Sequence, residues 1–189
     1  MFTYPQKVLL SQSNTIRCYV KVNQVNILFD YDENDPLEIA EALAQIHDWE
    51  FNRIGEDHIA IVMEGLWRHY FLSLSKSNFD EEMIKVICTF ELTSREKYKN
   101  NLFEALNSVN QKIWMGSFSY CQEEELIIFR YGITLTDVFG FTHQQVSDLL
   151  DRTFELCERY YPVFQMIYSG KSDLPEALNL ALGCASGEA

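Results

Sequence analysis

The sequence feature that most limits the possible folds is a series of strand patterns between residues 49 and 92, which no helix pattern interrupts. The runs read WEFNRI, HIAIVM, LWRHYFLSL and MIKVICTFEL, and short turn segments or the polar SKSNFDEE separate them. In the last run, apolar residues alternate with Lys85, Thr89 and Glu91, which indicates a strand with one solvated side. Antiparallel sheets tolerate a solvated face, whereas parallel sheets are usually buried on both faces, so we expect an antiparallel sheet.

Capping signals predict helices on either side of these strands. Asp35 precedes Pro36, a combination typical of a helix N-terminus, and the apolar spacing continues to about His47. A second helix pattern begins near Ser94, with apolar residues at every third or fourth position as far as Ile113. Two more strand patterns follow, WMGSFSYC and ELIIFRYGITL, and the acidic segment between them predicts a hairpin.

The third helix pattern is the clearest. Thr142 and Gln145 have the spacing of a capping box, and a long apolar stripe follows them. We expect Pro162 to kink or interrupt this helix because it lacks an N–H, and Gly170 to end it in a left-handed cap. The order of helix, three or four strands, helix, two strands and helix contains no βαβ alternation. The sequence therefore predicts an α+β, two-layer fold: a single antiparallel sheet with three main helices largely on one face.

The 189 residues are enough for one domain with a core of its own. Residues 1–33 form an N-terminal arm with possible extra strands, because TIRCYVKV alternates apolar and polar residues. Residues 34–170 contain the three main helices and the strands of the sheet. Residues 171–189 contain a short helix pattern, LPEALNLAL, and a tail of small residues.

Composition excludes several classes of partner. The chain has 15 Lys and Arg against 28 Asp and Glu, a formal net charge of −13, which repels a phosphate backbone. We therefore expect no nucleic-acid partner; a basic partner or plain solubility accounts for the charge. Five scattered cysteines without a CxxC pair are typical of a reducing compartment. We expect a cytoplasmic protein with no membrane contact, since the chain shows neither a signal-peptide pattern nor a run of ~18 apolar residues.

No motif predicts catalysis. SGKS at residues 169–172 resembles the end of a phosphate-binding loop, but Gln165 replaces its first glycine and a helix precedes it where a strand is required. The four histidines lack metal-ligand spacing, although His58 and His69 could share a face of neighbouring strands. We predict no catalytic residue, no cofactor and no metal site.

Arg130 is unusual because it follows ELIIF in an otherwise apolar strand. A buried guanidinium requires a carboxylate or carbonyl partner. We expect that partner within the chain, and the alternative is a carboxylate of another protein.

The stretch SVNQKIWMGSFSY, residues 108–120, alternates aromatic residues around Gly116. These residues could form a core layer or floor a binding groove. We expect the core layer, in which Trp114, Gly116, Phe118 and Tyr120 lie opposite Phe154, Cys157, Tyr161 and Phe164 of the third helix. Tyr160 and Tyr161 of that helix are further candidates for packing or for partner binding.

Six stretches from about residue 48 onwards carry a family resemblance: DWEFNRIGEDHIAI, GLWRHYFLSL, ALNSVNQKIWMGSFSY, LIIFRYGITL, ERYYPVFQMIYSGKS and EALNLALGCASGEA. They resemble the YbjN family of bacterial sensory transduction regulators, and most of all its alphaproteobacterial branch. The resemblance implies a fold similar to that of type III secretion chaperones. Those are small, acidic, usually dimeric proteins that bind extended segments of other proteins. The resemblance implies no catalytic residues.

These observations leave two functions. The first is a non-catalytic regulatory or chaperone-like domain that holds a segment of an unidentified protein partner. The alternative is a small-molecule-sensing or enzymatic domain with a pocket between the sheet and the third helix, which convergent ionisable groups with perturbed pKa would favour. We expect the first, and we also expect a homodimer, because the resemblance implies one and the N-terminal arm could pair across subunits.

Overall fold

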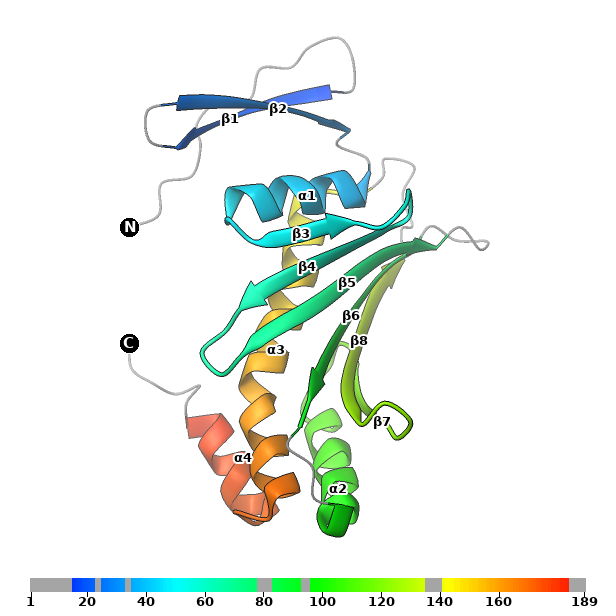
Figure 1. Ribbon diagram of the computed structural model, residues 1–189, viewed down its shortest axis with the longest axis vertical. Helices are drawn as coiled ribbons and strands as arrows, with labels where there is room; N and C mark the ends of the chain where they lie inside the picture. The colour runs from blue at the N-terminus through cyan, green and yellow to red at the C-terminus, as the bar shows by residue number, and fades with distance from the viewer. Residues whose placement is uncertain are drawn as a thin grey trace.

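The computed structural model describes residues 15–22, 25–32, 35–77, 83–92, 96–134 and 141–183 (Figure 1). The elements in chain order are β1 (Thr15–Val22), β2 (Val25–Asp32), α1 (Pro36–Ile46), β3 (Glu50–Arg53), β4 (His58–Glu64), β5 (His69–Ser77), β6 (Met83–Glu91), the short 3-10 helix η1 (Glu96–Tyr98), α2 (Lys99–Asn110), β7 (Ser117–Cys121), β8 (Leu126–Thr134), α3 (His143–Ser169) and α4 (Leu174–Gly183).

Strands β3 to β8 form one antiparallel sheet in the order β3-β4-β5-β6-β8-β7. The helix α2 carries the chain from β6 to the edge strand β7, and β8 then returns between them as the predicted hairpin. Both edge strands are short, with 4 residues in β3 and 5 in β7, which limits unwanted pairing with other chains. The predicted α+β fold with a single antiparallel sheet is confirmed. The strand patterns of the N-terminal arm form β1 and β2, which pair with each other in a separate sheet.

One face of the six-stranded sheet supplies most of the core. Strand pairing places Ile61, Leu72, Cys88, Phe129 and Phe118 side by side across the sheet, and all five are buried. The helix α3 crosses behind this sheet in Figure 1, and buried residues of α1 and α3 belong to the same apolar cluster. The sheet residues of opposite alternation point away from these helices and are more exposed, as expected for an antiparallel sheet with one solvated face.

The predicted ends of α1 and α3 are confirmed, whereas α2 runs from Lys99 to Asn110, inside the predicted range from Ser94 to Ile113. Asp35 caps α1 by accepting the Leu37 N–H, and Thr142 forms a complete capping box at the N-terminus of α3. Gly170 ends α3 with a φ of 68°, in the left-handed region. Of the two outcomes predicted for Pro162, a kink or an interruption, the interruption is wrong, because α3 continues over 27 residues. Packing of its apolar stripe on the sheet offsets the one backbone hydrogen bond that proline removes.

Candidate functional site

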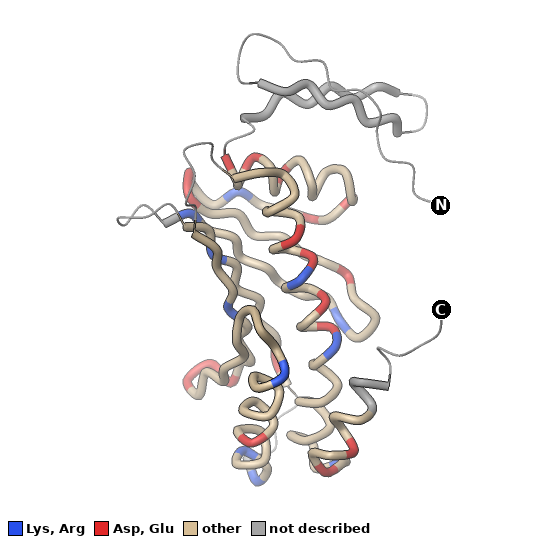
Figure 2. The backbone as a smooth tube through the Cα atoms, turned by 180° about the vertical axis from the view of Figure 1, so that it is seen from behind, with Lys and Arg blue, Asp and Glu red and all other residues tan. Residues whose placement is uncertain are grey.

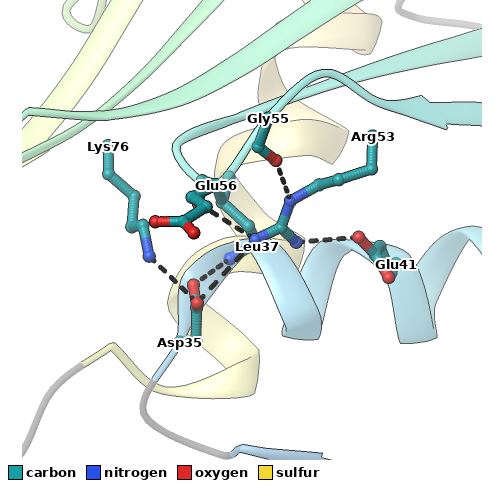
Figure 3. A network of polar contacts seen from close by, with 7 residues as sticks. All are labelled: Asp35, Leu37, Glu41, Arg53, Gly55, Glu56 and Lys76. Carbon is teal, nitrogen blue, oxygen red and sulfur yellow. Dashed lines mark hydrogen bonds and ion pairs between the residues drawn. The ribbon is translucent and has the colours of Figure 1, made fainter.

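The most connected cluster of charged side chains joins the N-terminus of α1 to the sheet (Figure 3). Asp35 accepts the Leu37 N–H at 2.9 Å and pairs with Lys76 Nζ of β5 at 2.9 Å. Arg53 of β3 donates to Glu41 of α1 at 2.7 Å and to carbonyls of the turn that follows β3. These charges pair with one another, so the cluster holds α1 against the sheet and is structural.

Local structure also accounts for the other polar motifs. Gly170 of SGKS is the cap of α3, so that segment ends a helix. His58 Nε2 lies 2.6 Å from Ser73 Oγ at one end of the β4–β5 pair, whereas His69 lies at the other end. Within the described ranges, no three His, Cys, Asp or Glu side chains are grouped so that they could hold a metal ion. The helices of the same ranges include none long and apolar enough to cross a membrane.

The aromatic stretch that leads into β7 divides into an exposed half and a buried half. Trp114 is 100% exposed in the bend before the strand, so the prediction that it belongs to the core is wrong. The cause is Gly116, whose φ of 74° lies in the left-handed region and breaks the two-residue alternation, so that β7 begins only at Ser117. Phe118 does belong to the predicted core layer, because it is buried with its ring centroid 5.1 Å from that of Phe164 on α3.

The two candidate tyrosines of α3 pack between that helix and the sheet. Tyr160 is buried, and its ring centroid lies 6.1 Å from that of Phe118. Tyr161 is half-buried, with its ring centroid 5.6 Å from that of Phe90 and 5.5 Å from the Arg68 guanidinium carbon. These contacts favour a structural role for both residues.

Arg130 lies on the open face of the sheet. Its side chain is exposed, and one guanidinium nitrogen donates to Ser119 Oγ at 2.7 Å. The expectation of a buried guanidinium is therefore wrong. Arg130 is aligned with Ile87 and Ser117 on neighbouring strands, on the side away from α3, because the next residue along β8, Tyr131, faces the helices.

The residues Trp114, Met115 and Gly116, here called the Trp114 turn, present two apolar side chains to solvent. Met115 is 42% exposed, and its sulfur accepts a hydrogen bond from the Tyr131 hydroxyl at 3.0 Å. A Cβ on Gly116 would collide with the ring of Phe129 and with the backbone carbonyl of β8 next to it. The turn is therefore seated directly on buried parts of the sheet, and Trp114 is left free to contact another molecule.

A second turn also presents a tryptophan. Leu66 is 85% exposed and Trp67 is 52% exposed in the connection between β4 and β5, and we call residues 65–68 the Trp67 turn. The Leu66 N–H donates to Glu158 Oε1 of α3 at 2.8 Å. Arg68 donates to the Glu91 carbonyl at 2.6 Å. Polar bonds to α3 and to β6 thus hold this turn in place.

Burial under the Trp67 turn changes the chemistry of two groups. Burial raises the pKa of the Tyr70 hydroxyl, and the adjacent Glu158 carboxylate raises it further. Burial likewise raises the pKa of the Cys157 thiol, with a further contribution from neighbouring Cys88. Both groups therefore stay neutral at pH 7, and neither becomes a nucleophile or a general base there.

Sequence reasoning missed the exposure of Leu66, Trp67 and Met115. The signal was present for the first two, since large apolar residues directly after Gly65 fall in a turn between strands. For Met115 and Trp114 the signal was the same glycine that was assigned to the core layer, because glycine is also the residue most tolerant of a positive φ.

Comparison with known proteins shows the family to which this chain is similar. The profile of the family YbjN, described as "Putative bacterial sensory transduction regulator", matches residues 36–166, a segment that begins at the first residue of α1. A solved structure described as "Crystal structure of YbjN, a putative transcription regulator from E. coli" is 12% identical in sequence. The match covers 65% of this chain and 85% of that chain, with a TM-score of 0.43. No curated protein matches the chain.

Proposed function

The chain belongs to the YbjN family of bacterial regulators, and from this premise we propose that it is a non-catalytic regulatory domain that holds a segment of a partner protein. The observation that carries the proposal is the Trp114 turn, in which a 100% exposed tryptophan stands next to a 42% exposed methionine. Tryptophan and methionine are both enriched in protein interfaces, and tryptophan is among the residues that contribute most to binding.

The energetic reason is the area that Trp114 leaves in water. A large aromatic side chain buries 150–250 Å² on contact, and at about 25 cal/mol per Å² this stabilises a complex by about 4–6 kcal/mol before the entropic cost of association. The fold itself derives nothing from this side chain, because it makes no buried contact. Burial of the Trp114 side chain would therefore stabilise a complex with a partner and not the fold of this chain.

The alternative is a sensing or enzymatic site between the sheet and α3, and the ionisable groups described there do not support it. The perturbed groups found there, Tyr70 and Cys157, belong to the packed core and remain neutral at pH 7. Convergent groups of an enzymatic site would instead have a pKa tuned toward the working pH.

The test compares two single-tryptophan variants. Wild-type protein, Trp114→Ala and Trp67→Ala serve as baits in capture from the native host, with mass spectrometry as the readout. We expect Trp114→Ala to lose proteins that wild type and Trp67→Ala retain, with a melting temperature within about 2 °C of wild type because an exposed side chain contributes little to stability. Retention of every specific partner by Trp114→Ala would contradict the proposal.

A further inference from the structure

The strand β8 has an outer edge that β7 covers only in part. β6 pairs with β8 along its whole length, from Leu126 to Thr134, whereas β7 pairs with β8 only as far as Arg130. From Tyr131 to Thr134, no other described strand pairs with β8 on the side of β7. The chain that precedes β7 does not continue the pairing, because Gly116 turns the backbone out of the strand.

A side chain of α2 reveals which backbone groups face this edge. The Asn110 side chain accepts the Phe118 N–H at 2.8 Å and donates to the Phe118 carbonyl at 2.9 Å, so these groups of Phe118 point away from β8. Backbone groups alternate between the two sides of an antiparallel strand, so Ser117 must direct its own toward Arg130, its partner in the register. On β8, the same alternation directs the N–H and C=O groups of Gly132 and Thr134 to the outer edge.

These outward groups are accessible. Gly132 and Thr134 are both exposed, and within the described residues no backbone hydrogen bond from a turn or loop reaches either of them. Gly132 has no side chain to obstruct a neighbouring backbone, and a glycine within a strand often marks such an approach. The Trp114 turn ends where β7 begins, and Met115 accepts a hydrogen bond from Tyr131 of this same segment.

Among the described side chains, two cations lie beside the free edge and favour an acidic partner, whereas Asp80, Glu81 and Glu82, which precede Met83 opposite Thr134, lie outside the described residues. Lys85 is aligned with Gly132 in the register, and Arg130 lies two residues before it on the same face of β8. The described strands β6, β7 and β8 contain one acidic residue, Glu91, which pairs with Leu126 at the other end of β8. At ~3.3 Å per residue that end is about 20 Å from Gly132. Several other acids of this chain lie along α3 (Figure 2).

We propose that an extended, acidic segment of a partner protein adds to the sheet as a strand at Gly132–Thr134. Its backbone pairs with the outward groups of Gly132 and Thr134, its carboxylates face Lys85 and Arg130, and an apolar residue contacts Trp114. Backbone pairing at a sheet edge supplies affinity in this mode of binding, and side-chain contacts supply specificity. This inference rests on the proposed function and specifies the kind of segment that is held.

The test uses three synthetic peptides of eight residues. The first alternates valine and aspartate, the second replaces aspartate by lysine, and the third is the valine–aspartate peptide with alternate backbone nitrogens methylated. We expect the first peptide to bind in a fluorescence titration of the tryptophans and to slow amide hydrogen exchange at Gly132 and Thr134. The lysine peptide and the methylated peptide should bind at least tenfold more weakly, because one lacks the charge and the other lacks the backbone donors.

Two protein variants locate the binding. Thr134→Pro removes an outward N–H that the β6 pairing does not use, and we expect it to weaken binding of the valine–aspartate peptide about tenfold, the effect of one hydrogen bond. Thr134→Val retains that N–H and is the matched control, expected to bind within about twofold of wild type. Melting temperatures verify that both variants are folded.

The outcomes separate this inference from the proposed function. Equal binding of the three peptides, no binding up to about 1 mM, or protection elsewhere than Gly132 and Thr134 would overturn strand addition. If Trp114→Ala loses natural partners and folded Thr134→Pro retains them, the protein holds its partners by another geometry and the proposed function stands. If Thr134→Pro loses the same partners as Trp114→Ala, strand addition is supported.

Discussion

The two turns that present a tryptophan are held in place by different physical means. The Trp114 turn is held by shape, because Gly116 adopts a positive φ and lies directly against Phe129. The Trp67 turn combines packing with polar bonds, because a Cβ on Gly65 would collide with the ring of Tyr70 and Glu158 accepts the Leu66 N–H. Close packing tolerates few alternative positions, whereas an exposed hydrogen bond can be exchanged for one to water.

This difference bears on how each turn would serve in binding. A turn held by packing presents its side chain in one position, which lowers the entropic cost of association. The Trp67 turn depends in part on exposed hydrogen bonds from Leu66 and Arg68, and it can shift when these are exchanged for bonds to water. The comparison thus favours the Trp114 turn as the preformed contact, and three substitutions test it, from the largest expected effect to the smallest.

Gly116→Ala should produce the largest loss of stability. The alanine would have a positive φ and its Cβ would collide with Phe129, so we expect a loss of about 2–4 kcal/mol in the free energy of unfolding. Gly55→Ala is the matched control, because Gly55 has a φ of 77° and its Cβ position has only an ordinary contact, 3.8 Å from Asp57 Oδ1. We expect about 1 kcal/mol there, measured by urea denaturation. Equal losses in the two variants would mean that packing against Phe129 does not fix the turn.

Glu158→Ala should have a smaller effect. It removes the acceptor of the Leu66 N–H, but that N–H is near solvent and can bond to water, so we expect a loss of about 1 kcal/mol. Hydrogen exchange at the Leu66 amide should accelerate. Glu155→Ala on the same helix is the control, since Glu155 is exposed and forms an ion pair with Arg152 of the same helix. We expect no change at Leu66. An unchanged exchange rate in Glu158→Ala would show that this bond does not hold the Trp67 turn.

Tyr70→Phe should have the smallest effect at neutral pH. The Tyr70 hydroxyl is buried beside the Glu158 carboxylate but forms no hydrogen bond of good geometry with it, so its removal should change the free energy of unfolding by less than about 1 kcal/mol. At high pH the free energy of unfolding of Tyr70→Phe should differ from that of wild type. Because burial raises the pKa of the folded Tyr70 above its unfolded value of about 10, the stability that neutral Tyr70 provides is complete below pH 10 and is lost as the pH rises further.

Urea denaturation between pH 8 and pH 11 measures this loss. Wild type should lose stability above pH 10 more steeply than Tyr70→Phe, by up to about 1.4 kcal/mol per pH unit. The contribution of Cys157, which declines above about pH 8.5, is common to both proteins and cancels in the comparison. Parallel curves above pH 10 would contradict the burial of an ionisable hydroxyl beneath the Trp67 turn.

The fold could be predicted from the sequence because its signals are local. The alternation in MIKVICTFEL and the capping residues Asp35 and Thr142 each act within a few positions, and the structure confirms them. Phe118 was placed correctly for the same reason, since it lies inside a strand whose alternation is intact.

The candidate site was harder to predict because it depends on backbone angles and long-range contacts. A positive φ at Gly116 removes Trp114 from the strand. A single glycine in the sequence does not show whether it adopts a positive φ or lies in a core layer. Arg130 was expected to be buried because its strand is apolar on both faces near its middle. The bond between Leu66 and Glu158 joins residues 92 positions apart, which no local pattern reveals. The homodimer stays a prediction.

The shortness of the free edge limits the lifetime of a strand added there. At Gly132–Thr134 an incoming segment has four backbone groups of β8 to bond, the N–H and C=O of Gly132 and of Thr134. Four hydrogen bonds at about 1 kcal/mol each correspond to a Kd near 1 mM, and at a typical association rate of ~10⁶ M⁻¹s⁻¹ such a complex lasts about a millisecond. Backbone pairing alone would therefore let segments exchange rapidly, and only those with an apolar residue that reaches Trp114 would be retained.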